Sequence, residues 1–339
     1  MTITLKEIAE QAIAKHSHRI LKHEAGVLLD KDPEELHQMR VGMRRWRSAI
    51  ARFSLAIDLP DVVTEKNISR IGHSLGKLRD LDVLLDVLSN NYRSQIPHKE
   101  QKSLDRVIKS LKKQRKHQLE RVRKTLNNRL YLSFKHELSN WLEHPKYRIL
   151  GNIAINYTLP DILLPQVSQF LLHPGWFVGV EVEEGKIEFP QILNMSAIKQ
   201  LLRREDVFLH DLRKSAKKTR YSLELFTQFY GDTYHDYVRQ VEQIQEILGQ
   251  IQDVHVLRKV LEKKLRCEAM PLGLSPISQK MPQLASLLSQ IRYQKWFEWQ
   301  ELQKYWLKEE TRTEFRQIIQ NGFGNATNSC TGEQPFASY

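Results

Sequence analysis

Apolar residues recur at helical spacing from the start of the chain. Near the N-terminus they fall on one face of an amphipathic helix; they are Leu5, Ile8, Ala12, Ile13, Ile20 and Leu28. Thr4 precedes this pattern, and Glu7 stands three positions after Thr4, which is the spacing of a capping box. We therefore expect an amphipathic helix from Thr4 to about Leu29.

The same periodicity predicts helices along most of the remaining sequence. The next helix has Asp32 as its N-cap and Pro33 at its first helical position, and Leu59-Pro60 ends it. The others are expected over residues 63–89, 99–143, 195–204, 209–226, 233–266 and 283–319. Helices that are joined by short loops form bundles, so we expect an all-α protein.

Residues 144–194 depart from the helical pattern. TLPDILLPQVSQFLLHPGW contains several prolines, which predict a break in helical structure. WFVGVEVEEGKIEF alternates apolar and polar residues on both sides of Glu184-Gly185, as a β-hairpin does. We therefore predict a first helical bundle over 1–143, a linker with a β-hairpin over 144–194, a second bundle over 195–320 and a flexible tail over 321–339.

Two segments of the chain occur twice at one separation. LHQMRVGMRRWRSAIARF, at 36–53, returns 173 positions later as LHDLRKSAKKTRYSLELF, at 209–226. LGKLRDLDVLLDVL, at 75–88, returns at the same separation as LGQIQDVHVLRKVL, at 248–261. A shared separation in two segments indicates an internal duplication.

The repeated helix has its cations on one face. At about 100° per residue, the cations of the first copy fall within about 80° of its leading histidine. These stripe residues are His37, Arg40, Arg44 and Arg47 in the first copy, and His210, Arg213, Lys217 and Arg220 in the second. The opposite face is apolar and should lie on the core; it holds Met39, Met43, Trp46, Ile50 and Phe53, and then Leu212, Ala216, Leu223 and Phe226. Because like charges one turn apart repel, we expect an anion to bind along the stripe.

The composition agrees with an anionic partner. Lys and Arg number 52 and Asp and Glu number 40, and the net charge of +12 favours polyanions. No apolar segment is long enough to cross a membrane. Lys6, Glu7 and Glu10 interrupt the segment where a signal peptide needs an apolar run, so we expect a cytoplasmic protein. Cys267 and Cys330 fit neither a disulfide framework nor a metal site, and we expect neither a metal nor a cofactor.

The two repeated segments together resemble the CHAD family, the conserved histidine α-helical domain. The resemblance rests on His-x-x-Arg-x-x-x-Arg-Arg-x-Arg, which starts at His37, and on the Leu-Gly-x-x-Arg-Asp-x-Asp downstream of it, and it spans roughly residues 4–319. It implies two four-helix bundles about a pseudo-twofold axis, with a basic surface that binds inorganic polyphosphate. Carried over by position, the implied polyphosphate contacts are His37, Arg40, Arg44, Arg45, Arg47, His210, Arg213, Lys217, Lys218 and Arg220.

The chain departs from the family pattern in two places. Gln252 stands where the first copy has Arg79. The predicted hairpin lies where a symmetric second half would have its first helix. The outer contacts of the second copy are therefore less well defined by the resemblance than those of the first.

Two further groups complete the predicted site. The predicted helix over 99–143 has many cations and few acids, and we add three of its lysines to the polyphosphate contacts: Lys112, Lys113 and Lys116. Asp80 and Asp253 lie in the repeated Leu-Gly segments, and we predict that they orient the arginines. Asp80 and Asp82 project about 200° apart on a helix, which does not suit a shared metal ion.

These observations favour a non-catalytic polyphosphate-binding protein. Polyphosphate is a dense row of charges without bases, and the arginine fork meets phosphate oxygens two at a time. Targeting to polyphosphate granules and binding to polyphosphate-metabolising enzymes are roles that such binding could serve.

Two other classes remain open. A nucleic-acid-binding protein would use the same charge, although the stripe has no aromatic side chain on which bases could stack. An enzyme or accessory subunit of polyphosphate or triphosphate metabolism is the second alternative. The sequence has no evident nucleophile, metal cluster or glycine-rich phosphate loop for catalysis.

Overall fold

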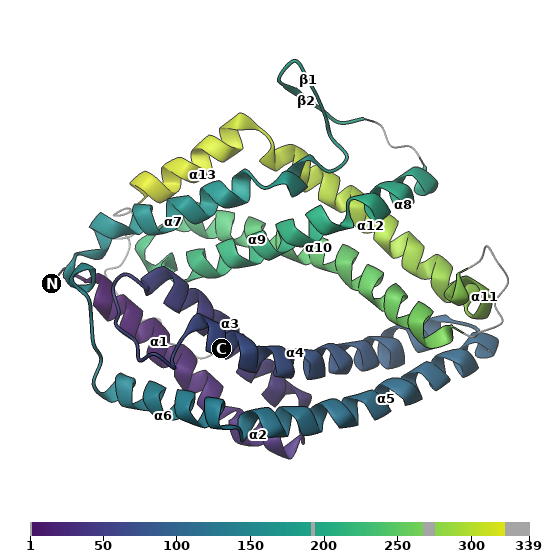
Figure 1. Ribbon diagram of the computed structural model, residues 1–339. Coiled ribbons are helices and arrows are strands. Elements are labelled where there is room, and N and C mark those ends of the chain that lie inside the picture. Colours follow the sequence, from purple (N-terminus) through teal and green to yellow (C-terminus); the bar gives the residue numbers. More distant parts are fainter. Residues whose placement is uncertain (1, 191–193, 267–274, 323–339) are drawn as a thin grey trace. The chain divides into compact units, whose positions relative to one another are not determined.

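The protein is built of α-helices with one short β-hairpin. The structure is a computed structural model that describes residues 2–190, 194–266 and 275–322 (Figure 1). Its helices are α1 (Leu5–Lys22), α2 (Glu24–Leu29), α3 (Pro33–Phe53), α4 (Glu65–Asp86), α5 (His98–Leu126), α6 (Arg129–Glu143), α7 (Ile155–Leu171), α8 (Met195–Arg204), α9 (Asp206–Glu224), α10 (Asp232–Leu265), α11 (Pro276–Lys280), α12 (Pro282–Trp306) and α13 (Glu309–Asn321). The strands β1 (Glu181–Glu183) and β2 (Lys186–Glu188) pair antiparallel. The predicted all-α class with a small hairpin is confirmed.

The chain divides into two compact units. Unit 1 consists of Met1–Ala154 and Asp253–Arg292, and unit 2 consists of Ile155–Gln252 and Tyr293–Tyr339. Helices α10 and α12 each contribute one part to unit 1 and the other part to unit 2. The units therefore differ from the predicted domains, which placed all of 195–320 in one bundle. The internal duplication stays a prediction from the sequence.

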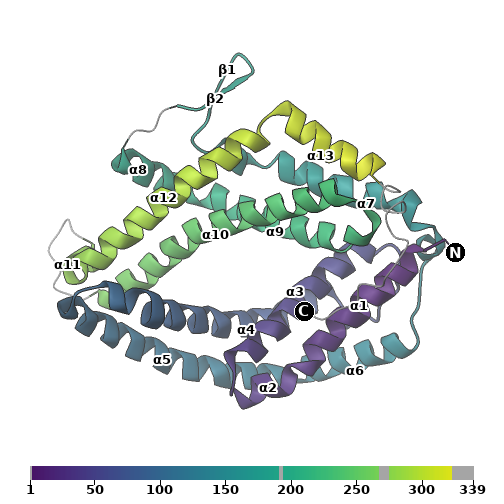
Figure 2. The same ribbon diagram turned by 180° about the vertical axis from the view of Figure 1, so that it is seen from behind.

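In unit 1, α1 and α3 lie side by side (Figures 1 and 2). The apolar face predicted for α3 is buried: Met39, Met43, Trp46, Ile50 and Phe53 are each at most 7% exposed. The indole Nε1 of Trp46 donates to Ser17 Oγ at 3.1 Å, so this buried donor is satisfied. A Cβ at position 42 would lie 3.0 Å from Ile20 Cγ1, so Gly42 lets the two helices approach closely.

A second core of unit 1 joins α4 and α5 to the parts of α10, α11 and α12 that belong to this unit. Its buried residues include Leu81, Leu104, Leu111, Leu257 and Leu284. The buried carboxylate of Glu100 accepts hydrogen bonds from the backbone N–H groups of Gln283 at 2.9 Å and Leu284 at 3.2 Å. The first amides of a helix have no partner within it and favour negative charge, so Glu100 fixes α5 to the start of α12.

Arg115 of α5 connects three helices of unit 1. Its Nη atoms donate to the carboxylate of Asp30 at 2.7 and 2.6 Å, and its Nε donates to Asp82 at 2.5 Å. Asp30 ends α2 in the left-handed region, with φ of 55°. Burial raises the pKa of Asp82, and the bond from Arg115 opposes that rise. Asp82 is therefore a partner of Arg115 in the fold.

The structure divides several of the predicted helices. Residues 99–143 form α5 and α6, because Asn128 caps a new helix by accepting from the N–H of Tyr131 at 2.8 Å. Residues 4–29 form α1 and α2 with a break at His23, and 283–319 form α12 and α13. The helix predicted over 63–89 ends as α4 at Asp86 and continues as a π-helical turn, η1 (Val87–Tyr92). Periodicity alone predicted the helical regions and missed these breaks.

The prediction of a non-helical linker over 144–194 is wrong for α7. This helix contains Pro160 and Pro165 in its interior. Its apolar face is fully buried, with Leu159, Leu163, Val167 and Phe170 each 0% exposed. Burying each of these side chains stabilises the folded protein by about 1.5–3 kcal/mol. The sum over the four side chains offsets a cost of about 3 kcal/mol for each internal proline. In unit 2, α7 packs against α9 as α1 packs against α3 in unit 1, so a helix takes the place assigned to the hairpin.

Tryptophans form the centre of unit 2. Trp176, Trp296, Trp299 and Trp306 are each 0% exposed. The ring centroid of Trp176 lies 5.4 Å from that of Trp299 and 5.9 Å from that of Trp306. The buried amide of Gln303 donates to the carbonyls of Trp176 and Val178 at 2.6 and 3.0 Å, which ties the segment before the hairpin to α12.

The hairpin has the predicted position and turn. Glu184 and Gly185, at φ of 48° and 79°, connect the strands, and Val182 pairs with Ile187. All six strand residues are exposed, and the hairpin projects away from the helices of its unit in both views (Figures 1 and 2).

Two sequence predictions concern parts of the chain that the structure does not describe. Cys267 and Cys330 lie outside the described residues, as does most of the predicted tail. Within the described residues, no helix has the length and apolar character needed to cross a membrane.

Candidate anion-binding site

Helix α3 starts at a strong local signal, and its register places the cationic stripe. Pro33 is its first residue, and the Asp32 carboxylate accepts from the N–H of Glu34 at 2.8 Å, as predicted. The buried face described above fixes the rotation of the helix. The predicted stripe is therefore turned away from the core of α1 and α3.

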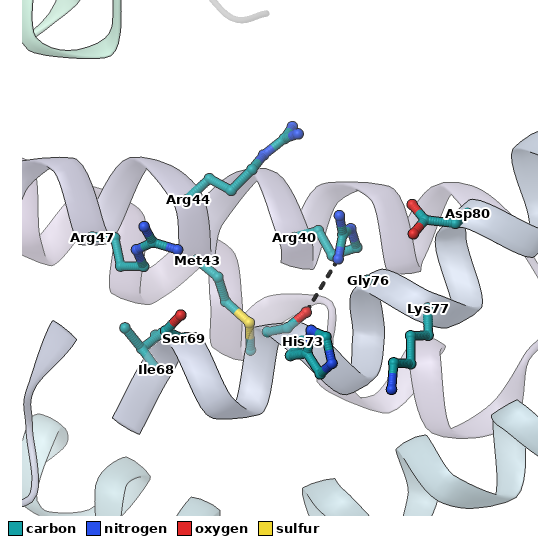
Figure 3. Close-up of a pocket in the computed structure, with 11 residues that line it drawn as sticks. Arg40, Met43, Arg44, Arg47, Ile68, Ser69, His73, Gly76, Lys77 and Asp80 are labelled. Carbon is teal, nitrogen blue, oxygen red and sulfur yellow. Dashed lines mark hydrogen bonds between the residues drawn. The ribbon is translucent and has the colours of Figure 1, made fainter. Parts of the chain in front are cut away.

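A pocket of about 310 Å³ opens between α3 and α4 in unit 1 (Figure 3). Helix α3 contributes three of the predicted arginines to its lining, and α4 contributes the opposite wall. The lining residues are Arg40, Met43, Arg44, Arg47, Ile68, Ser69, Gly72, His73, Gly76, Lys77 and Asp80. The structure therefore brings three arginines of the first copy together in one concave, cationic site.

Arg40 is seated on glycines of α4. Its Nη1 donates to the carbonyl oxygen of Gly72 at 3.1 Å (Figure 3). A Cβ at position 76 would lie 2.5 Å from the same Nη1, so only glycine leaves room for the guanidinium there. Gly76 is the glycine of the first Leu-Gly segment. The spacing identified that segment as a motif, and the structure gives the glycine a physical role.

Arg47 is exposed, whereas Arg40 and Arg44 are half-buried. Arg47 Nε lies 3.4 Å from Glu65 Oε1, and the two side chains are 45% and 52% exposed. An ion pair this exposed contributes at most about 1 kcal/mol, so an anionic ligand can compete for Arg47. The side chain of Arg44 extends outward past the pocket (Figure 3). Arg45, a predicted contact, is not among the residues that line the pocket.

His37 lies on the stripe at the N-terminal side of Arg40 and is half-buried, outside the pocket lining. Burial, reinforced by the charges of Arg79 and Arg44, lowers the pKa of His37 below its ordinary value, and Glu34 opposes this. At neutral pH in the free protein its ring is therefore uncharged, and a phosphate nearby would favour protonation.

Of the wall formed by α4, only Asp80 was among the predicted site residues. Ser69, His73 and Lys77 are spaced by four residues, so they form one row that faces the arginines of α3. Asp80 lies at the Arg40 end of the pocket (Figure 3). This spacing was visible in the sequence, but a short row of mixed polar residues is common on exposed helix faces. Only its position opposite the arginines distinguishes it.

The second copy repeats the seat of its first arginine. A Cβ at position 249 would lie 3.1 Å from Arg213 Nε, and Gly249 is the glycine of the second Leu-Gly segment. Arg213 and Gly249 thus correspond to Arg40 and Gly76 in position and in contact.

Beyond this seat, the second copy differs in charge. Arg220 forms ion pairs with Glu242 and, at 3.4 Å, with Glu224, and its side chain is only 11% exposed. Glu242 and Glu246 occupy the positions that correspond to Ser69 and His73 of the first copy. The second copy therefore has two carboxylates at positions where the first copy has none, and Arg220 is already paired with acidic side chains of its own unit.

The other predicted residues of the second copy vary in exposure. Lys217 is half-buried and Lys218 is exposed. His210 is half-buried, and burial together with Lys214 and Arg213 lowers its pKa. Lys214 itself pairs with Asp211 at 2.5 Å.

The remaining predicted residues lie outside the pocket. Lys112, Lys113 and Lys116 are exposed on α5 and do not line it. Asp253 is exposed on α10. Among the described residues, no group of three His, Cys, Asp or Glu side chains is placed to hold a metal ion.

The fold and the site together define a helical domain whose basic helix lines an open pocket suited to an anion. The model of the CHAD domain family matches residues 11–262, and the chain therefore belongs to this family. The sequence matches none of the curated proteins with which it was compared.

Two solved structures have the same fold. The CHAD domain from the plant Ricinus communis is similar over 94% of this chain and 93% of that chain, with a TM-score of 0.56 and 20% identity. PptA from Streptomyces chartreusis is similar over 89% of this chain and 100% of that chain, with a TM-score of 0.60 and 11% identity. At these identities the likeness concerns the fold.

Proposed function

We propose that this protein binds inorganic polyphosphate without catalysis, and that the pocket between α3 and α4 is the principal site. The observation that carries the proposal is the meeting of Arg40, Arg44 and Arg47 with His73 and Lys77 in one open pocket. Four permanent cations line it and Asp80 is its one carboxylate. Charge-assisted hydrogen bonds from such groups to phosphate oxygens contribute about 1.5–3 kcal/mol each.

The geometry also favours phosphate over a nucleobase. No aromatic side chain is among the lining residues, so bases would have no surface on which to stack. Ser69 and His73 both line the pocket, but no hydrogen bond joins them, and among the described residues no three His, Cys, Asp or Glu side chains are grouped to hold a metal ion; both points support a binding role. Membership of the CHAD family supports a role related to polyphosphate or triphosphate. In the cell, binding of this kind would place the protein on polyphosphate granules.

The test compares wild-type protein with a variant that has Arg40, Arg44 and Arg47 changed to Gln. We expect the affinity for long-chain polyphosphate, measured by calorimetry, to fall by about tenfold or more for each arginine that no longer binds phosphate. A matched control changes three exposed cations of unit 2, Lys199, Arg203 and Lys308, to Gln and should bind nearly as wild type. Circular dichroism checks that both variants are folded.

The same samples distinguish the alternative functions. Single-stranded RNA and duplex DNA are added as competitors at equal phosphate concentration, and poor competition is expected. Polyphosphate chain length is followed over time by gel electrophoresis and should stay constant. Equal loss of affinity in the arginine variant and its control would reject the pocket as the site. Progressive shortening of the chain would reject the non-catalytic role.

A further inference from the structure

A row of cations runs along the outward face of α5, separate from the pocket. At about 100° per residue these side chains fall within about 80° of one another. They are Lys102, Arg106, Lys109, Lys113 and Lys116, and Lys112 flanks them. All are exposed, and none lines the pocket between α3 and α4. We name these five residues the α5 row.

The orientation of the α5 row is fixed by the opposite side of the helix. Leu104, Val107, Ile108 and Leu111 are buried in the core that α5 shares with α4 and the ends of α10 to α12 in unit 1. From Lys102 to Lys116 the row extends about 21 Å at 1.5 Å per residue. A rigid helix therefore presents a straight line of charge of this length.

The charge of the α5 row is not neutralised by its neighbours. The two exposed acids nearest to it are already paired: Asp105 with Arg93 at 2.9 Å, and Glu120 with Arg123 at 2.7 Å. Glu100 is buried against α12. Within the described residues, none of the five cations forms an ion pair. Cations one turn apart repel one another, so an external polyanion would relieve that repulsion.

The chemistry of this face suits a flexible chain of phosphates. Between residues 102 and 116 every exposed side chain is polar or charged, so the face has neither an aromatic platform for bases nor an apolar face for a membrane. Four of the five cations are lysines. Their ammonium groups are point charges on flexible side chains and can bind phosphates that approach from many directions.

We propose that the α5 row is a second contact surface for polyphosphate, so that long chains bind to the pocket and the row together and short chains bind to the pocket alone. This proposal rests on the proposed function of the pocket. Once one part of a chain is bound, the second contact becomes intramolecular, and such linkage raises overall affinity by about 10²- to 10⁴-fold when both sites are spanned. The protein would thereby select chains by length.

The experiment measures binding of tripolyphosphate and of long-chain polyphosphate to the wild-type protein and to a variant with Lys109, Lys113 and Lys116 changed to Gln. We expect affinity for tripolyphosphate to be unchanged and affinity for the long chain to fall by about tenfold or more. The dependence of long-chain affinity on salt should become shallower, because fewer phosphate contacts release fewer counterions. Changing the same three lysines to Arg should preserve long-chain binding.

The control variant Lys199, Arg203 and Lys308 to Gln has the same net charge as the row variant and separates a local contact from general charge. If both variants bind the long chain equally well, the α5 row is not a contact surface, and the proposed function of the pocket stands. If the row variant loses both ligands alike, the length selection is wrong. If it loses duplex DNA binding and keeps long-chain polyphosphate, the row serves nucleic acid and this proposal is overturned. If wild type binds neither phosphate ligand, the pocket proposal fails as well.

Discussion

At the scale of single residues, the site depends on where a guanidinium can lie. Arg40 projects onto α4, and the absence of a side chain at Gly76 leaves the space that its Nη1 occupies. The carbonyl of Gly72 then accepts its hydrogen bond at 3.1 Å. A charge held in this way loses little conformational freedom when a ligand arrives, which favours binding.

Changing Gly76 to Ala should weaken polyphosphate binding without changing the charge of the protein. The added methyl would stand 2.5 Å from Arg40 Nη1 and displace that side chain. In Gly72→Ala the nearest atom to the methyl is Met43 Sδ at 3.8 Å, an ordinary contact, so Arg40 keeps its place. Both changes replace a helical glycine by alanine. We expect the larger loss of affinity, by calorimetry, in Gly76→Ala; equal losses would show that the seat of Arg40 is unimportant.

Polyphosphate binding should strengthen as the pH falls through the pKa that His37 has in the complex, and the gain should level off below its lowered pKa in the free protein. Burial and neighbouring cations lower the pKa of His37 in the free protein, and a bound polyanion raises it. Binding is then coupled to proton uptake, and affinity gains up to about tenfold for each unit by which the pKa rises. His37→Gln should flatten the pH profile, measured by titration at a series of pH values. If the pH dependence of affinity is the same in His37→Gln as in the wild type, the proton taken up on binding is on a group other than His37.

The same lowered pKa has the opposite effect on stability. Without ligand, the unfolded chain binds a proton on His37 more readily than the folded chain does. The free energy of unfolding therefore falls as the pH drops below about 6.5. Burial lowers the pKa of His16 to about 3, so this residue adds to the loss in the same direction.

At the scale of secondary structure, tertiary contacts determine which helices form and how they are joined. Helix α7 forms despite Pro160 and Pro165 because its apolar face is buried. Helix α5 is held at its N-terminal end because its own Glu100 accepts hydrogen bonds from the first backbone N–H groups of α12. Local sequence signals cannot contain either contact, because both partners are distant in the chain.

Changing Glu100 to Ala should destabilise unit 1. The backbone N–H groups of Gln283 and Leu284 would lose their buried partner, at a cost of about 1–3 kcal/mol. Glu120→Ala is the control, since the exposed pair of Glu120 with Arg123 contributes at most about 1 kcal/mol. Urea denaturation followed by circular dichroism measures both. A similar loss in the two variants would contradict the capping role of Glu100.

The sequence predicted the elements that have local signals and missed those that depend on contacts with residues distant in the chain. It predicted α3 from its cap to its buried face, since Asp32, Pro33 and the apolar spacing are local signals. It also predicted α8 to the residue and the turn of the hairpin. It missed α7, because proline is a breaker by local rules, and the polar wall of α4, because a row such as Ser69, His73 and Lys77 gains meaning only opposite the arginines. Duplication identified Gly76 as part of a motif, but its purpose required the position of Arg40.

At the scale of the whole molecule, the two copies of the basic helix have different surroundings. The first copy faces Ser69, His73 and Lys77 across a pocket. The second has Glu242 and Glu246 at the positions of Ser69 and His73, and Glu242 already pairs with Arg220. We infer that the first copy contributes more of the binding free energy.

Removing cations from the first copy should therefore cost more affinity than removing their counterparts from the second. Arg40 and Arg44 changed together to Gln should weaken long-chain polyphosphate binding by about tenfold for each arginine replaced. Arg213 and Lys217 changed to Gln remove the same charge from corresponding positions, and a smaller loss is expected. Calorimetry on both double variants, with thermal melting to check folding, decides between unequal and equal copies. A larger loss in the second variant would reverse the assignment.

The composition of unit 1 has a consequence for how the chain is made. Its second core needs Leu257 and Leu284 to cover Leu104 and Leu111, and these residues are far apart in the order of synthesis. At about 5–20 residues per second, a ribosome takes on the order of ten seconds to pass from the end of α6 to the start of α12. During that interval the apolar side of α5 can pack on α4 but lacks the cover that α12 provides, so a nascent chain halted before α12 would present a site for chaperones and for aggregation. Completion of unit 1 must wait until the first part of α12, up to Arg292, has left the ribosome.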